Sequence, residues 1–150
     1  MSHTVHPYSH RLGIIRDWKS RWFGTRDKYK ENLRADVLII EYLKKRFRGN
    51  FVSSMEIERS EKIFRLIIET SRPGMIIGRQ HEGMDKLREE ILRFMRRHKI
   101  SLKQELKIDI KEIKSPEGNA MIAAQMIAEG LEKRMPFRRV MKQMAEKAFA

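Results

Sequence analysis

A short polar loop headed by a glycine is the stretch of this sequence best suited to hold an anion. It lies in PGMIIGRQHEG (73–83), where Gly78, Arg79, Gln80 and His81 follow two isoleucines. Glycine has no Cβ, so the backbone of such a loop can approach a ligand closely. A helix that begins directly after the loop adds free N–H groups, which favour an anion there. The loop therefore indicates a backbone clamp on phosphate; the plainer alternative is a glycine that only ends one helix before another.

Lysine and arginine gather at further places that suit phosphate groups. Residues 1–24 form a basic arm in which cations alternate with aromatic side chains. We expect its arginines to bind phosphate and Trp18 and Trp22 to pack the arm onto the core. Near the other end, three cations at three- and four-residue spacing share one face of a helix, where a merely solvated face is the alternative. The candidate cations are Arg11, Arg16, Lys19 and Arg21 in the arm, Arg72 before the loop, and Arg138, Arg139 and Lys142 near the end.

The charge of the chain supports a polyanionic partner. Among 150 residues, 33 lysines and arginines face 20 acids, which gives a net charge of +13 and a pI of about 10.3. A domain this basic usually meets nucleic acid when its cations are clustered, whereas scattered cations would serve solubility alone.

Several classes of function are disfavoured by composition. The absence of cysteine excludes disulfides, thiol catalysis and cysteine-ligated zinc. No apolar run approaches the roughly 20 residues that cross a bilayer, and no apolar segment of a secretory signal opens the chain. We therefore expect a soluble intracellular protein with no membrane contact. No set of acids and histidines suits catalysis or metal binding, so we expect neither an enzyme nor a cofactor or metal; the histidines are His3, His6, His10, His81 and His98.

Periodicity predicts a mixed α/β (α+β) fold. Apolar spacing and end signals predict the order helix, strand, strand, short helix, loop, helix, strand, helix, helix. The predicted helices are residues 25–48, 82–99, a segment from Ser115 to about Lys133, and 135–150, and the predicted strands are residues 51–59, 62–70 and 104–113. We divide the chain into the arm (1–24), a three-stranded domain packed by helices (25–115) and the start of a second domain that is cut short (116–150).

The same spacing predicts which side chains point into the core. The apolar faces we expect are Leu33, Val37, Ile40, Leu43 and Phe47; Phe64, Leu66 and Ile68; Met84, Leu87, Ile91, Phe94 and Met95; Ala123, Ile127 and Leu131; and Phe137, Met141 and Met144. Ser115 and Pro116 are expected at the first positions of their helix, as N-cap and N1.

These motifs together resemble the small-subunit ribosomal protein three family in its bacterial or organellar form. The resemblance covers nearly the whole chain and lies in VHPYSHRLGIIRDWKSRWF (5–23), IER (57–59), TSRPGMIIGRQ (70–80), KLR (86–88) and LEKRMPFRRVMK (131–142). Two features depart from the family. The second glycine of its loop falls at His81, and Gly83 is not an equivalent position. The family chain is also longer and continues into a further domain.

The resemblance implies a type II K-homology (KH) domain whose Gly-X-X-Gly loop clamps an RNA backbone. It implies a structural constituent of the small-subunit head in a cytoplasmic or organellar ribosome, bound to small-subunit ribosomal RNA and neighbouring head proteins. By resemblance, Arg138, Arg139 and Lys142 line the channel through which messenger RNA enters and assist its unwinding.

Two alternatives from other classes remain open on the sequence. A free-standing KH regulator would use the same loop to bind a short single-stranded RNA outside the ribosome. A nuclease would need metal-binding acids or a positioned base, and we find no convincing set.

Overall fold

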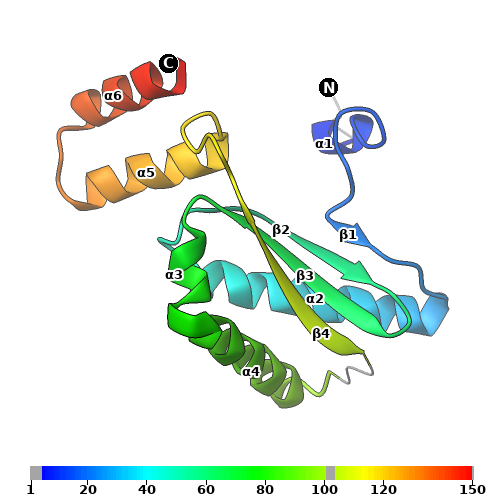
Figure 1. The fold of residues 1–150 in the computed structure, drawn as a ribbon. Coiled ribbons are helices and arrows are strands. Elements are labelled where there is room, and N and C mark those ends of the chain that lie inside the picture. Colours follow the sequence, from blue (N-terminus) through cyan, green and yellow to red (C-terminus); the bar gives the residue numbers. More distant parts are fainter. Residues whose placement is uncertain (1–4, 101–103, 150) are drawn as a thin grey trace.

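The computed structural model of the protein describes residues 5–100 and 104–149. Figure 1 shows its elements in the predicted order, preceded by a short helix and a short strand of the arm. The elements are α1 (Pro7–His10), β1 (Ser20–Arg21), α2 (Arg26–Arg46), β2 (Val52–Arg59), β3 (Ile63–Thr70), α3 (Pro73–Ile77), the 3-10 turn η1 (Arg79–His81), α4 (Glu82–Arg97), β4 (Glu105–Glu112), α5 (Ala120–Glu132) and α6 (Phe137–Phe149).

The described strands form one sheet in the order β1-β2-β3-β4. The hairpin strands β2 and β3 are antiparallel, while β1 runs parallel to β2 and β4 runs parallel to β3. The mixed α/β class and the three predicted strands are therefore confirmed, and the sheet has one further strand that the sequence did not predict. The fourth strand comes from the arm, where Ser20 and Arg21 pair with Ile57 and Glu58. Two residues carry too little alternation to be recognised as a strand.

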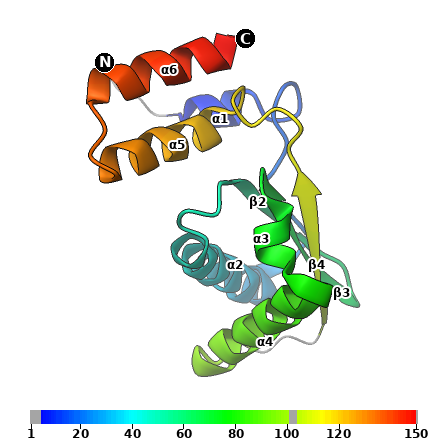
Figure 2. The same cartoon turned by 60° about the vertical axis from the view of Figure 1, so that its left-hand side comes forward.

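One face of the sheet carries the hydrophobic core. Phe64, Leu66 and Ile68 alternate along β3 as predicted, and all three side chains are fully buried. Helices α2 and α4 cover that face, as Figure 2 shows, and contribute Leu43 and Ile91 among others. Each such side chain adds about 1.5–3 kcal/mol to the stability of the fold through burial. The core thus fixes α4, and with it the loop at its start.

The buried face of α2 differs from the predicted one. Leu33 and Val37 are exposed, whereas Ala35, Asp36 and Ile39 are buried. Two apolar stripes with the same spacing run along this helix, and the one that includes an aspartate is the one that faces the sheet. Spacing alone cannot rank them, because the partner of the buried carboxylate lies far away in the sequence.

That partner is an arginine on β2. Arg59 donates from Nε and a terminal nitrogen to Oδ1 of Asp36, and Trp22 donates from Nε1 to Oδ2 at 2.7 Å. The two charged side chains are 7% and 3% exposed, so each depends on the other for neutralisation. Trp22 therefore attaches the arm to α2 and β2 as expected. Trp18 was also expected to pack onto the core, but it is 53% exposed.

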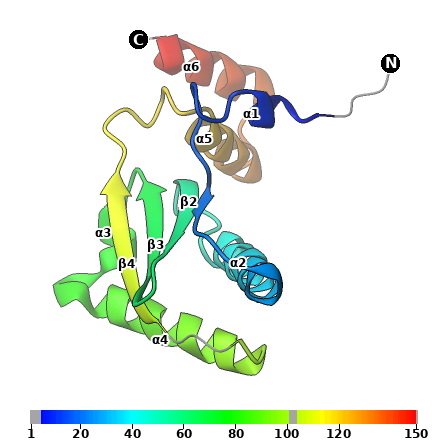
Figure 3. The ribbon, with the colours of Figure 1, turned by 90° about the vertical axis from the view of Figure 1, so that its right-hand side faces the viewer.

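Helices α5 and α6 lie beyond the end of the sheet at which β4 finishes, as Figure 3 shows. Helix α5 begins later than predicted: Asn119, and not Ser115, accepts hydrogen bonds from the N–H groups of Met121 and Ile122. Asn119 also donates from Nδ2 to Ser53 on β2 at 2.8 Å, a tertiary contact that selects it as the cap.

The buried faces of these two helices are also shifted from the predicted ones. A Cβ on Gly130 of α5 would lie 3.1 Å from Val140, so the glycine permits close contact with α6. Val140 and Met144 are buried on α6, and Met144 alone among its three predicted core residues points inward. Leu131 on α5 and, on α6, Phe137 and Met141 are exposed, contrary to prediction.

Candidate nucleic-acid interface

The predicted phosphate clamp is a tight turn between α3 and α4. Gly78 ends α3 with φ 71° and ψ −175°, a conformation that a side chain would strain. Gln80 and His81 follow with φ 50° and 66°, both in the left-handed region. A glycine at position 81 would meet this geometry without cost, whereas histidine tolerates it at some expense. The backbone thus keeps a glycine-like shape at the point where the sequence departs from the family.

Gly83 has a separate role that the sequence did not indicate. A Cβ built on it would lie 2.4 Å from the carbonyl oxygen of Ile76 and 2.8 Å from that of Ile77. The first turn of α4 therefore rests directly on the last turn of α3, which is possible only without a side chain. Ile76 is 4% exposed and joins the core, so the two isoleucines and Gly83 together set the angle of the loop.

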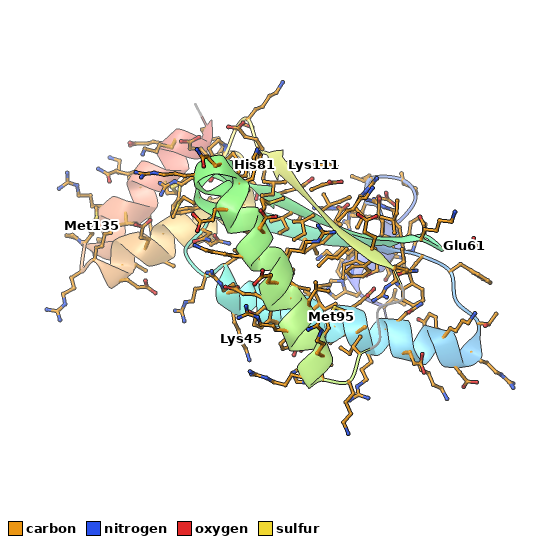
Figure 4. The ribbon with its side chains drawn as sticks, turned by 60° about the horizontal axis from the view of Figure 1, so that its bottom comes forward. Lys45, Glu61, His81, Met95, Lys111 and Met135 are labelled. Atoms are coloured by element: carbon orange, nitrogen blue, oxygen red, sulfur yellow. The ribbon has the colours of Figure 1, made fainter. Side chains whose placement is uncertain are left out.

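The charges around the loop are mixed. Arg79, Gln80 and His81 are exposed, and Figure 4 shows His81 at the start of α4, far from Met95 near its other end. The first turn of α4 carries Glu82 and Asp85, which already complement the positive end of the helix. Lys86 donates to Glu82 at 2.5 Å and lowers the pKa of that carboxyl. The loop therefore offers less net positive potential than its sequence suggested.

A shallow groove continues from the start of α4 along β4. Its lining includes two cations, Arg88 and Lys107, against three acids, Asp85, Glu105 and Asp109. Arg88 lies 3.6 Å from Glu105, so one of those cations is already paired. Such a surface does not repel a nucleic acid outright, but it supplies no excess of positive charge for a phosphate backbone.

The arm places its cations in two different settings. Lys19 and Arg16 lie 5.2 and 5.7 Å from the centre of the Tyr8 ring, and both side chains are exposed. Arg11 is exposed as well, although it donates to the carbonyl oxygen of Pro7 at 2.9 Å. These three remain accessible to a phosphate. Together they form one basic surface, which contains Arg11, Arg16 and Lys19.

Arg21 is used differently. It lies 2.7 Å from Asp17, 2.7 Å from Glu56 and 2.8 Å from Glu58. Partial burial lowers the pKa of Arg21, but its hydrogen bonds to Asp17 and Glu58 outweigh that effect and raise the pKa above its ordinary value. With three carboxylates around one guanidinium, its contacts within the described chain hold β1 against β2. Arg72 is likewise engaged, 4.3 Å above the ring of Phe51.

The predicted cations of helix α6 are neutralised only weakly by other described residues. Arg138 and Arg139 are exposed and have no carboxylate within ion-pair distance among the described residues. Lys142 is 3.9 Å from Glu146, at the limit of an ion pair. Val140, between the arginines and the lysine, is buried against α5 and so orients the helix. The three predicted residues thus share an outward face.

One basic surface was missed in the sequence. Lys44 and Arg48 stand at i and i+4 near the end of α2, on the side that faces β2 and α5. The run KKRFRG offered a signal, because cations four residues apart share a helix face. In the sequence, that run predicts only the end of a helix.

The described residues contain no cluster of three or more metal-binding side chains, and His3 lies outside them. His6 accepts a hydrogen bond at Nδ1 from the N–H of Tyr8 and so caps α1. No helix in the part of the chain that the structure describes is long and apolar enough to cross a membrane.

A comparison with protein families identifies the class of this domain. The family model described as "KH domain" matches residues 38–118, from the middle of α2 past the end of β4. The chain belongs to the KH domain family. The match includes the loop and the groove along β4.

The resemblance read from the sequence is also confirmed by individual relatives. The chain is 41% identical to small ribosomal subunit protein uS3 of Caldicellulosiruptor saccharolyticus and 37% identical to that of Clostridium novyi, each over 148 residues. It is 43% identical to the protein of the same name from Koribacter versatilis. Each alignment covers 99% of this chain but only 63–64% of the relative, so the chain spans somewhat less than two thirds of their length.

Proposed function

We propose that the protein is a structural, noncatalytic constituent of the small ribosomal subunit, bound to small-subunit ribosomal RNA in the subunit head and in contact with neighbouring head proteins. The observation that carries this proposal is the similarity to proteins named small ribosomal subunit protein uS3 along 99% of the chain. The exposed cations of the arm and of α6 supply the phosphate contacts that such a role needs. Binding then falls steeply as salt rises, because each neutralised phosphate releases counterions.

In this proposal, one face of α6 lines the messenger RNA entry channel and binds messenger RNA through Arg138, Arg139 and Lys142. Two arginines without acidic partners among the described residues, beside a weakly paired lysine, repel one another unless a polyanion screens them. A rigid row of such cations can hold single-stranded phosphates as they enter the ribosome and so assist unwinding of structured messenger RNA.

The free-standing KH regulator is the weaker candidate. It would bind its RNA in the groove along α4 and β4, where acids outnumber cations. The strongest positive surfaces lie outside that groove, on the arm and on α6. An extended surface of this kind suits folded RNA better than one short strand.

The proposal is tested by sedimentation of lysate from cells that express the tagged chain. We expect the wild type to travel with small subunits and with translating ribosomes. Arg138→Glu/Arg139→Glu should still join subunits but should impair translation through messenger hairpins. Arg96→Glu/Arg97→Glu, at the far end of α4, makes the same charge change. It should also join subunits, and it should leave translation through messenger hairpins unchanged. Recovery of the wild type only at the top of the gradient contradicts the ribosomal role.

A further inference from the structure

A cleft of about 440 Å³ lies between the end of α2, the start of β2 and α5. Figure 2 shows α5 above α2 and β2. Apolar side chains, among them Ile40, Val52, Met55 and Met121, form much of its lining. A cavity of this size falls within the range of small-ligand sites, which begins near roughly 300 Å³. None of the loop residues 78–81 lines it, so it is separate from the predicted phosphate clamp.

Positive charge borders the cleft on the sides formed by the arm and by the end of α2. Lys19 contributes from the arm, Lys44 from α2, and Arg48 from the turn that follows α2. No carboxylate belongs to the lining. Arg48 reaches Glu132 at 3.3 Å, but both side chains are largely exposed, so that pair is weak. The field at the mouth therefore favours an anion.

A polar atom inside the wall lacks a partner. Gln125 on α5 donates from Nε2 to the carbonyl oxygen of Val52 at 2.8 Å, which fixes the orientation of its amide. Its Oε1 is buried and has no hydrogen-bond partner among the described residues. A buried acceptor left unpaired is costly, and a ligand N–H group in the cleft can pair with it once the Gln125 side chain turns toward the cleft.

The neighbouring hydroxyls are already engaged and do not compete for this role. Ser53 accepts from Asn119 at 2.8 Å, and Ser54 donates to Glu69 at 2.6 Å. The ligand that fits has an apolar, flat body, an N–H donor and an attached negative charge. A nucleotide combines these three features, whereas an apolar protein side chain would leave the cations and the amide oxygen unused.

We propose that this cleft holds one unstacked nucleotide of a single-stranded RNA segment. Its base lies against Met55 and Met121 and donates to Oε1 of Gln125 after that side chain has turned toward the cleft, and its phosphates are bound by Lys19 and Lys44. The inference rests on the proposed RNA-binding function and adds a second, sequence-tolerant contact point to it. It also explains the basic pair Lys44 and Arg48 at the end of α2, which the loop and α6 leave without a role.

The test is methyl NMR of the full 150-residue chain with labelled methionines, titrated with 5′-AMP and with adenosine. We expect the methyl signals of Met55 and Met121 to shift, and those of Met75 and Met141, which are 57% and 53% exposed outside the cleft, to stay. AMP should bind more tightly than adenosine, because only AMP carries the phosphate.

Charge reversal on α2 gives a matched pair of variants. Lys44→Glu removes a lining cation and should weaken AMP binding about fivefold, whereas Lys45→Glu, one residue on and outside the lining, should leave it within about twofold. Both residues are exposed, so both variants should fold, with unchanged methyl signals away from the cleft.

Two outcomes overturn the inference. One is a titration in which neither cleft methionine responds although the chain still sediments with small subunits. The other is equal affinity for AMP and adenosine with no effect of Lys44→Glu, which would show that the cations of the cleft bind no phosphate. If the methyl signals respond as expected but the chain never joins subunits, the nucleotide site is supported and the ribosomal role is contradicted.

Discussion

The contact between α3 and α4 at Gly83 leads to a prediction whose size follows from the structure. In Gly83→Ala, the new Cβ would start 2.4 Å from the carbonyl oxygen of Ile76 and 2.8 Å from that of Ile77. Ordinary carbon–oxygen contacts lie near 3.3 Å or beyond, so the start of α4 must move by about 0.9 Å or more. Overpacking of this kind costs about 1–3 kcal/mol, and alanine returns up to about 1 kcal/mol through its helix propensity.

The clash is with backbone atoms, so we take the upper part of that cost, about 2–3 kcal/mol, and subtract about 1 kcal/mol for helix propensity. We therefore expect Gly83→Ala to lower the free energy of unfolding by about 1–2 kcal/mol. For a chain of this length that corresponds to a fall in Tm of roughly 2–8 °C. Urea unfolding followed by circular dichroism measures the first quantity, and differential scanning calorimetry measures the second. The loop should also lose its fixed shape, because Gly78 lies against the backbone of Gly83.

Gly74→Ala is the matched control. It lies in α3, one helix earlier, and a Cβ there would meet nothing within 4 Å. We expect it to be neutral or to stabilise the fold by up to about 1 kcal/mol, because alanine restricts the unfolded chain. The reasoning is refuted if Gly83→Ala is as stable as the wild type, or if Gly74→Ala costs as much as Gly83→Ala.

Three further predictions concern charges and backbone strain. Asp36→Asn leaves a buried guanidinium without its counter-charge and should cost about 3–5 kcal/mol in urea unfolding, whereas Asp109→Asn, which breaks an exposed pair, should cost below about 1 kcal/mol; equal costs would contradict the role of burial. His81→Gly should stabilise the fold by about 1 kcal/mol by the same assay, since φ is 66° there, and a loss of stability would show that the histidine makes a compensating contact. Lys86 lowers the pKa of Glu82, so this pair stabilises the fold above the ordinary carboxyl value of 4.5 and loses its effect as pH falls through the lowered value. Lys86→Gln should raise the pKa of Glu82 in an NMR titration, and an unchanged value would contradict the pairing.

Local pattern was sufficient where one face of an element is plainly apolar. Phe64, Leu66 and Ile68 alternate with polar or outward residues, and the structure buries them as predicted. Pattern failed on α2, where Leu33 and Val37 have helical spacing but remain exposed. The competing stripe buries Ala35 and Ile39, and its carboxylate is tolerated there because Arg59 on another element neutralises it. Spacing within one helix contains no information about that partner.

At the candidate site too, local sequence predicted some features and could not predict others. The loop, the arm and the α6 cations were visible as residue types at given spacings. The ion pairs of Arg21 with Glu56 and Glu58 could not be predicted, because these acids lie 35 and 37 residues further along the chain. The nucleotide cleft was hidden for the same reason: its walls come from the arm, α2, β2 and α5, and no single stretch of sequence contains more than a part of it.

During synthesis, strand β1 of the arm is made before β2, the strand with which it pairs. A chain grows from its N-terminus, so Arg21 is made well before Glu58, 37 residues later, against which it must settle. At synthesis rates of about 5–20 residues per second, that interval is between about 2 and 7 seconds. Throughout it the arm is a free, cationic segment with no strand to join. Any RNA within reach can meet Arg21 before Glu56 and Glu58 do.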